Sequence, residues 1–406
     1  MEPSLRKFPY PFMCALSISS DIDNASSVES FSAIMDYFNG TKETPFGMGL
    51  DLEVGNSFWF FNNSERTQLS YFDGLNRKRT ELAPIIQQLW KSNHIDTIHS
   101  WGNFDKGSFE RKYAEIGFRE LDKYQIKIPI WINHGIGLNH QKVGNYPNMY
   151  GDSPNHSAYH LDYTFNVGCE YFWVGKTTHI IGQNSKPTLS VKAKQAIQYI
   201  MKRTKYKNVV DPIYDDGNEL LTPIIFRDGT QAFEFTRFIN SWGKEQVLDI
   251  NDLSTQIKKS TINQLIKNEG FMVLYTHFNE HVKMSGLPYL LIKNLKYLKG
   301  KVDDGFIFMC TTSRLLKYKE LLDYIRYTVL KSQKEIHIVI ESEMGTPIGL
   351  KQIKYDQLQG LTFYTKFPEK TKIMFNNSFL KTEQNPKDET GEYSISIPWR
   401  KLEYPE

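Results

Sequence analysis

Residues 13–23 read MCALSISSDID, an apolar run that ends in the carboxylates of Asp21 and Asp23. Four further apolar runs end in polar residues: 95–98 before His99, 128–132 before Asn133 and His134, 271–276 before His277, and 306–310 before a Thr-Thr-Ser run that ends at Ser313. Buried parallel strands read as continuous apolar runs. Residues just past such strands build the active sites of parallel α/β barrels. The five strand ends therefore predict one metal-assisted hydrolytic site.

The composition is that of a large globular protein without a strong charge bias. The chain has 406 residues, which favours two domains, and 40% of them are hydrophobic. A formal net charge of only +3 gives no argument for nucleic acid or an anionic membrane surface as a partner. The aromatic fraction of 14% suits a sugar-binding cleft, although a large aromatic core explains any single ring better.

Neither the cysteines nor the first residues indicate export. Cys14, Cys169 and Cys310 lie far apart, without metal-knuckle or redox spacing, and are expected to be buried free thiols. Residues 1–10 hold charges and prolines instead of the apolar segment of a secretory signal. No run approaches the length of a membrane span. We therefore expect a cytoplasmic protein.

Strands and helices alternate over residues 1–332, which predicts an α/β domain with a mostly parallel sheet or barrel. The helical patterns cover 27–38, 80–91, 106–124, 188–203 and 314–329, with one more around Lys293 and Asn294. Residues 137–167 break the pattern with Gly, Pro, Asn, Tyr and His. A loop of this length is usually functional, and we expect it to fold over the mouth of the barrel.

From residue 333 to 406 the pattern changes to alternating runs separated by Pro, Gly and Asn turns. Period-two runs with turn signals predict a small antiparallel, β-sandwich-like module. The module could bind carbohydrate or a partner, or could cover barrel surface or form the interface of a homo-oligomer.

Asp21 and Asp23 are two residues apart, so on an extended backbone both side chains point the same way. Like charges so close are costly unless a proton or a cation lies between them. A bound metal would resolve this, with one carboxylate as ligand and the other as base. The alternative is a capping role, since Asp23 or Asn24 precedes the helix expected from residue 27.

His99 and Asn103 are four residues apart and would share one face of a helical turn, where both could chelate an ion. His is an ordinary zinc ligand, whereas Asn is an unusual one. A lone His is more often a hydrogen-bonded core residue, but His99, His134 and His277 stand at three separate strand ends.

The chain resembles the polysaccharide deacetylase superfamily, which comprises metal-dependent carbohydrate esterases and N-deacylases with a distorted (β/α)7 barrel. The run 16–23, LSISSDID, is similar to the acidic first motif of that family, and residues 99–103, HSWGN, are similar to its His-Ser/Thr-x-x-His motif. The run 274–277, LYTH, resembles its last motif with one extra residue. The Arg-x-Pro-Tyr/Phe motif is not evident, and residues 131–135, WINHG, stand in its place.

This resemblance implies a metal-dependent amidohydrolase. Asp23, His99 and Asn103 would hold a divalent metal, with Zn²⁺ as the expected ion. Asp21 would take a proton from the attacking water, and His277 would protonate the leaving amine. Asp105, His134 or His160 could replace Asn103 as ligand or orient the others.

Residues expected to contact the substrate are Trp101, His134, Tyr159, His160, Asp162 and Arg227. For Arg227 an ordinary surface ion pair is the stronger expectation. The implied substrate is an N-acetylated or N-formylated sugar or glycan intermediate, in a setting of surface-glycan biosynthesis. Two alternatives stay open: a degenerate barrel that binds sugar without hydrolysing it, and a glycoside hydrolase that uses paired carboxylates.

Overall fold

The computed structural model describes residues 2–135, 138–145, 147–185, 192–193, 218–240, 248–279, 282 and 284–405. The helix expected over 188–203 falls outside these residues, apart from Lys192 and Ala193.

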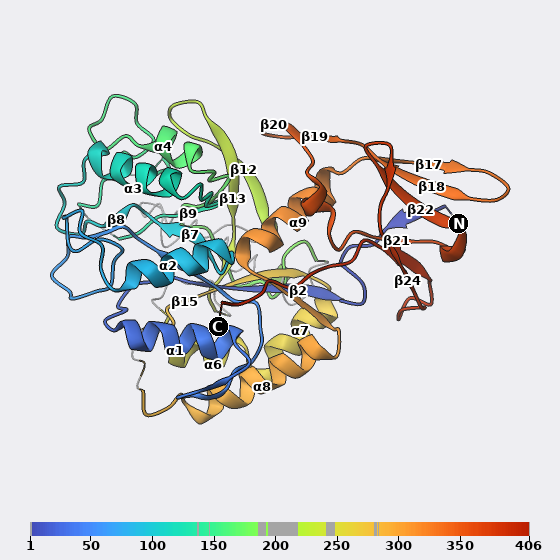
Figure 1. The fold of residues 1–406 in the computed structure, drawn as a ribbon, viewed down its shortest axis with the longest axis horizontal. Coiled ribbons are helices and arrows are strands. Elements are labelled where there is room, and N and C mark those ends of the chain that lie inside the picture. Colours follow the sequence, from blue (N-terminus) through green and yellow to red (C-terminus); the bar gives the residue numbers. More distant parts are fainter. Residues whose placement is uncertain are drawn as a thin grey trace.

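The main body is an α/β unit built on a strongly curled, mostly parallel sheet of eleven strands (Figure 1). The order along the sheet is β11 (Thr177–Thr178), β14 (Arg237–Phe238), β15 (Phe271–Thr276), β2 (Cys14–Ser20), β5 (Gly55–Phe58), β7 (Ile95–His99), β9 (Ile130–Ile132), β10 (Tyr171–Trp173), β13 (Gln231–Phe235) and β12 (Leu221–Ile225), with β16 (Ile307–Met309) beside β2. All five apolar runs are confirmed as strands of this one sheet. The described strands form a half-barrel whose path ends at β11 and β12.

Strand β2 is the centre of the sheet, and every one of its residues is buried. On one side it pairs in parallel with β15, from Ala15 to Ser20. On its other side β16 pairs with the first half of β2, and β5 pairs with Ser19 and Ser20. The end of β2 is therefore held between β15 and β5, and this fixes where Asp21 and Asp23 emerge.

The register of β16 corrects one expectation. Its last residue, Met309, pairs with Leu16, well before β2 reaches Asp21. The Ser313 backbone N–H donates instead to the Asp96 carboxylate at the start of β7, at 2.7 Å. The fifth strand end therefore does not reach the expected site.

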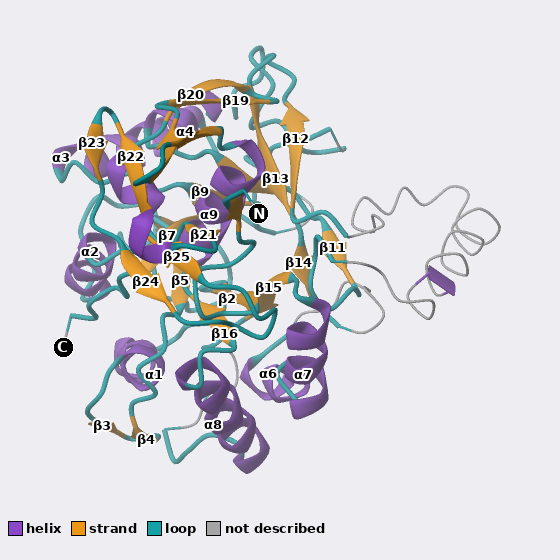
Figure 2. Ribbon diagram, turned by 90° about the vertical axis from the view of Figure 1, so that its right-hand side faces the viewer, coloured by secondary structure: helices purple, strands orange, loops and turns teal. Residues whose placement is uncertain are grey.

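Helices pack against both faces of the curled sheet (Figure 2). They are α1 (Val28–Asn39), α2 (Leu82–Lys91), α3 (Arg111–Lys123), α4 (Leu161–Asn166), α6 (Ile250–Gln256), α7 (Lys259–Asn268), α8 (Tyr289–Asp303) and α9 (Thr312–Tyr324). The last of them, α9, shares a core cluster with Ala15 of β2 and Ile130 of β9 on the inner face, and the others lie outside. The expected helices at 27–38, 80–91 and 106–124 are confirmed, but α9 ends at Tyr324 and the chain then enters a strand. None of the helices that the structure describes is long and apolar enough to cross a membrane.

Ser27 caps α1, because its side-chain oxygen accepts the backbone N–H of Ser30. Neither Asp23 nor Asn24 is therefore needed as the cap. Both Asp21 and Asp23 keep their carboxylates for other partners.

The C-terminal module contains two small sheets and a hairpin (Figure 1). The first sheet joins β17 (Tyr327–Lys331), β18 (Ile336–Ile340), β22 (Thr371–Phe375) and β23 (Ser378–Phe379), and the second joins β1 (Ser4–Leu5), β21 (Thr362–Tyr364), β25 (Ser394–Ser396) and β24 (Glu383–Asn385). The hairpin is β19 (Glu343–Thr346) with β20 (Gly349–Gln352), and the short 3-10 turns are η1 (Tyr355–Leu358) and η2 (Pro368–Lys370). All these pairings are antiparallel except β18 with β22. The first of these strands, β17, begins at Tyr327, and the N-terminal β1 pairs with β21 of the second sheet.

Two short pairs complete the described strands around the main sheet. They are β3 (Glu43–Thr44) with β4 (Gly47–Met48), and β6 (Phe61–Asn62) with β8 (Gly102–Asn103) in parallel.

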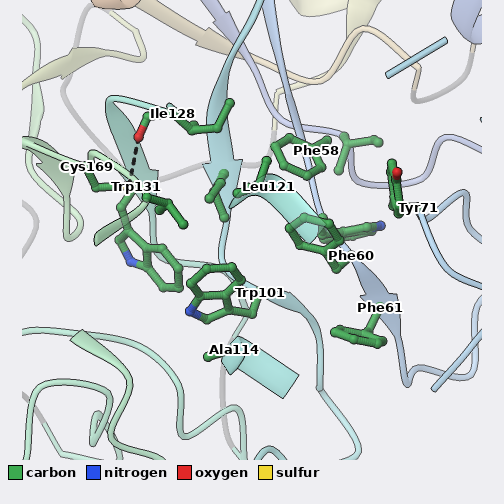
Figure 3. Packing of buried hydrophobic residues seen from close by; sticks show 14 of the residues in the cluster. Phe58, Phe60, Phe61, Tyr71, Trp101, Ala114, Leu121, Ile128, Trp131 and Cys169 are labelled. Atoms are coloured by element: carbon green, nitrogen blue, oxygen red, sulfur yellow. Dashed lines mark hydrogen bonds between the residues drawn. The ribbon is translucent and has the colours of Figure 1, made fainter. Parts of the chain in front are cut away.

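Much of the aromatic surplus is core. Trp101 and Trp131 lie near one another under the sheet, and Phe58, Phe60 and Phe61 continue the cluster (Figure 3). These rings are fully buried, so they supply packing area and cannot line an open cleft.

The last described residues run back from the module to the barrel. The Leu402 backbone N–H donates to the buried Glu53 carboxylate at 2.9 Å, and the Tyr404 hydroxyl donates to Asp36 on α1 at 2.9 Å. Lys401 forms an ion pair with Asp51. This segment closes over the surface between α1 and α9.

Arg6 joins the first strand to the module. Its guanidinium is buried, bonds to the Asp388 carboxylate at 3.0 Å, and donates to the carbonyls of Phe8, Pro9, Pro11 and Phe12. Tyr364 and Thr390 also donate to the Asp388 carboxylate, so the loss of Arg6 removes the only cation paired with that carboxylate among the described residues, together with the charged donor to the carbonyls.

We predict that Arg6→Met, which keeps the aliphatic volume, lowers the free energy of unfolding by about 3–5 kcal/mol. Urea denaturation followed by circular dichroism measures the change. Arg77→Met, at an exposed position, is the matched control and should stay within about 0.5 kcal/mol of the parent protein. Equal stability of the two variants would show that Arg6 does not tie the module to the barrel.

Candidate metal centre

Asp23, His99 and His134 form a compact cluster just past the ends of β2, β7 and β9. The distance from His99 Nε2 to Asp23 Oδ2 is 2.8 Å, and from His134 Nδ1 to Asp23 Oδ1 it is 3.0 Å. The two ring nitrogens, His99 Nε2 and His134 Nδ1, are themselves 2.8 Å apart. Three ligand residues therefore converge from the ends of three parallel strands, of which β7 and β9 are adjacent and β5 separates β2 from β7, and this arrangement could hold a metal ion.

Asp23 also belongs to a second group, with Asp21 and His277, whose ligand atoms all lie within 4.8 Å of one another. His277 Nδ1 donates to the Leu248 carbonyl at 2.8 Å, which leaves Nε2 facing Asp23 Oδ2 at 3.6 Å. The side chains of β2, β15, β7 and β9 thus meet at one point, as the parallel strand ends predict.

Ser100 fixes the two strand ends that carry the histidines. Its backbone has φ +55°, in the left-handed region, and its hydroxyl donates to the Ile132 carbonyl at 3.1 Å. The same hydroxyl oxygen accepts the His134 backbone N–H at 3.0 Å. One side chain therefore bridges β7 and β9 directly below His99 and His134.

A network of amide side chains holds the segment after His134 against the turn after His99. The Asn139 amide donates to the His134 carbonyl, while Gln141 accepts from the Trp101 backbone N–H and donates to the Gly102 carbonyl. These contacts restrict the backbone on both sides of the cluster.

Asp21 is held by an arginine that the sequence analysis did not single out. Arg237 of β14 is fully buried and contacts both Asp21 carboxylate oxygens at 3.1 Å, and it donates to Ser19 Oγ at 2.8 Å. Its guanidinium also lies 4.4 Å from the centre of the Trp173 ring. This pair neutralises the Asp21 charge inside the protein and fixes the orientation of its carboxylate.

The charges of the cluster reinforce one another. Burial alone would raise the pKa of Asp23, but the neighbouring His134 and His99 outweigh it and hold that pKa well below its usual range. Burial would lower the pKa of His134, yet the Asp23 and Asp105 carboxylates raise it to about 10. The site therefore has a strong preference for positive charge beside Asp23.

The donor atoms fit a divalent cation. The atoms that face one another are the Asp23 carboxylate oxygens, His99 Nε2 and His134 Nδ1, and carboxylate oxygen with imidazole nitrogen is an ordinary ligand set for Zn²⁺. The 2.8 Å contact between two imidazole nitrogens has room for only one proton, whereas an ion bound by both nitrogens at about 2.0–2.1 Å uses both lone pairs. Asp105, 3.6 Å from His134 Nε2, is placed to orient that ring as carboxylates do beside metal-bound histidines.

Asn103 is not among these atoms. Its Oδ1 accepts the Asp105 backbone N–H at 3.0 Å, within the turn after His99. The nitrogen that completes the cluster comes from His134, which was expected as a substrate contact or a substitute ligand.

Trp101 and His160 were expected to contact substrate, but both are fully buried. The Trp101 indole N–H donates to His160 Nδ1 at 3.1 Å, and His160 Nε2 donates to the Gln141 carbonyl at 2.6 Å. With no accessible surface and with internal partners, these side chains support the core beneath the cluster.

The other expected substrate residues form polar pairs nearer the surface. Asp162 makes an ion pair with Arg111, and Tyr159 donates its hydroxyl to Asp228 at 3.0 Å. Arg227 forms an ion pair with the buried Asp152, as the simpler reading of this arginine anticipated. Substrate contact by Tyr159 and Asp162 stays a prediction.

Two residues at the site were missed, Arg237 and Trp59. The alternation of Phe233, Phe235 and Arg237 puts a charge on an inward position of a buried strand, a signal that was available in the sequence. Trp59 lies edge-on to the His134 ring, with centroids 4.9 Å apart, and nothing in its local sequence marks it.

We predict that the purified protein binds about one equivalent of a divalent ion, and that His134→Ala and His99→Ala both lose it, because each removes one of the three converging ligands. Asn103→Ala should retain the ion. Elemental analysis after dialysis measures the content, with circular dichroism as the control for folding. Loss in Asn103→Ala and retention in His134→Ala would contradict this ligand set.

A second prediction concerns His160. Burial lowers its pKa to about 4, below the value of about 6.5 in an unfolded chain. Between these values the unfolded state binds a proton that the folded state does not, so this residue lowers stability as the pH falls from about 6.5 to about 4.

His160→Gln cannot titrate, so the stability gap between the parent protein and this variant should shrink by on the order of 2–3 kcal/mol between pH 7 and pH 4. Urea denaturation at several pH values measures the gap. Parallel pH curves for the two proteins would show that His160 does not carry this effect.

Comparison with known proteins adds no assignment: no family model matches the chain, and no curated protein matches it.

Proposed function

We propose that the protein is a metal-dependent hydrolase of the deacetylase-like distorted-barrel type, which removes an N-acyl group from a sugar or glycan intermediate. The observation that carries the proposal is the convergence of Asp23, His99 and His134 beside a separate Asp21–Arg237 pair. A bound Zn²⁺ would polarise the acyl carbonyl and lower the pKa of a bound water molecule.

Asp21 would act as the general base. Its carboxylate is 2% exposed and its orientation is fixed by two contacts to Arg237, so it can point at one position without rearrangement. In this proposal Arg237 would take the role of the arginine whose motif is not evident in the sequence.

His277 would supply the proton to the leaving amine. Burial lowers its pKa, but in the ion-free protein the neighbouring Asp23 and Asp21 carboxylates outweigh burial and raise it to about 9. Its Nδ1–H is committed to the Leu248 carbonyl, so the proton that it can donate is on Nε2, the atom that faces Asp23.

The substrate class is supported by the resemblance to carbohydrate deacetylases and by the chemistry of the cluster. Acetyl and formyl groups both suit such a site, and synthesis of surface glycans in the cytoplasm is the proposed setting. A glycoside hydrolase is less well supported, because Asp21 is neutralised by Arg237 and Asp23 lies among three imidazoles.

We predict that the protein releases acetate or formate from N-acylated amino sugars, and that chelation abolishes this activity until zinc is restored. Asp21→Asn should lower kcat by about 10²–10⁴-fold, the usual loss of a general base, while the bound ion is retained. Enzymatic assay of the released acid measures the activity.

Asp73→Asn, at an exposed position, makes the same chemical change away from the site and should keep full activity. Full activity in Asp21→Asn, or activity that survives complete removal of the ion, would rule out this mechanism. If the protein binds one ion but releases no acid from any acylated sugar, the assignment of the metal centre stands and the proposed substrate class is rejected.

A further inference from the structure

A groove with a volume of about 630 Å³ lies between the barrel and the C-terminal module. Its walls come from the start of α9, the β19–β20 hairpin, η1 and the returning segment around Trp399. The volume is within the range of about 300–1,000 Å³ that is usual for small-molecule sites.

This groove lies at the N-terminal ends of the parallel strands, whereas the metal centre lies at their C-terminal ends. Asn93 precedes β7, Pro129 precedes β9 and Glu170 precedes β10, so the groove borders the strand beginnings. His99 stands at the far end of β7, roughly 15 Å away for a strand of this length. The groove is therefore a separate site and not an extension of the metal centre.

The lining is strongly basic in a protein whose overall charge is close to neutral. Seven lysines and arginines line the groove, against two carboxylates, Glu170 and Asp356. Four of the cations have no ion pair within the part of the chain that the structure describes: Lys127, Lys317, Lys354 and Arg400. Of these, only Lys317 is half-buried, and the other three are exposed.

The remaining cations are compensated by acids, of which Glu170 lines the groove and the others lie outside its lining. Arg314 pairs with the buried Glu53, Lys351 with Glu170 and Glu320, and Lys401 with Asp51. These pairs fix the walls of the groove. The unpaired cations are therefore the ones available to a ligand.

Neutral groups of the lining suit a polar organic molecule. The amides of Asn93, Gln352, Gln357 and Gln359 offer both donors and acceptors. Trp399 adds a half-buried ring, and the Arg314 guanidinium lies 3.7 Å from its centre. Cations set among amides and one aromatic ring match a ligand with an anionic end and a hydroxylated remainder.

We propose that this groove binds a small organic phosphate that carries a diphosphate group. Lys317, Lys354 and Arg400 contact the phosphate oxygens, since Arg and Lys are the usual partners of this group. The amides contact the rest of the molecule. The site is independent of the metal centre and does not depend on the hydrolytic function proposed above.

The test is calorimetric titration of the ion-free full-length protein, in chelator, with inorganic pyrophosphate and with uridine diphosphate. Removing the ion excludes binding of the probes at the metal centre. Both probes should bind, and the triple variant Lys317→Gln/Lys354→Gln/Arg400→Gln should bind them at least about tenfold more weakly, because charged hydrogen bonds to phosphate are lost.

The matched control is Lys334→Gln/Lys366→Gln/Lys381→Gln, which removes the same charge from exposed positions outside the groove. It should leave the affinity within about twofold. Both variants change accessible side chains and should unfold at the parent temperature, which circular dichroism checks.

Three outcomes would overturn the proposal. They are no binding at about 1 mM probe, an equal loss of affinity in both triple variants, and binding of the parent protein only to vesicles that contain anionic lipid. The last result would identify the groove as a membrane contact instead of a small-molecule site.

Discussion

Two carboxylates leave the core at the end of one fully buried strand, and the rest of the site compensates their charge. Asp21 and Asp23 follow β2, which is held between β15 and β5 and cannot move them toward solvent. A buried carboxylate is costly without a partner of opposite charge. Arg237 provides this partner for Asp21. Asp23 is surrounded by imidazoles, which balance it only when they hold protons or share a cation. The same constraint therefore gives one carboxylate a fixed orientation and makes the other a point of ion attachment.

Much of the architecture could be predicted from the sequence because strand ends are local signals. The runs before Asp21, His99, His134 and His277 are apolar and short, and all four are strands of one sheet, in the order β15, β2, β7 and β9 with β5 between β2 and β7. Because the strands are parallel, the polar residues that follow them all lie at the same end of the sheet. The prediction for the fifth run was wrong because strand register depends on pairing between segments that are distant in the sequence. β16 pairs with the first half of β2, so its end does not reach Asp21.

The remaining site residues depend on tertiary contacts that leave little mark on the local sequence. His134 joins the cluster because Ser100 ties the end of β9 to the end of β7. Trp101 and His160 looked like surface ligands for sugar, but they bond to each other inside the core. An aromatic ring or an imidazole has the same local signature in both settings, and only burial separates them.

The returning segment at residues 399–404 has a consequence for how the protein is made. Trp399 lies against Arg314, Leu402 bonds to Glu53 and Tyr404 to Asp36, so contacts at the base of the half-barrel await residues translated at the very end of this sequence. β1 likewise waits for β21, which is synthesised more than 350 residues later. The nascent chain on the ribosome can pair β2 with β5 early, but the module and this seam assemble only after nearly all of the sequence has left the exit tunnel. The seam at Glu53 and Asp36 therefore closes only after residues 399–404 have been synthesised.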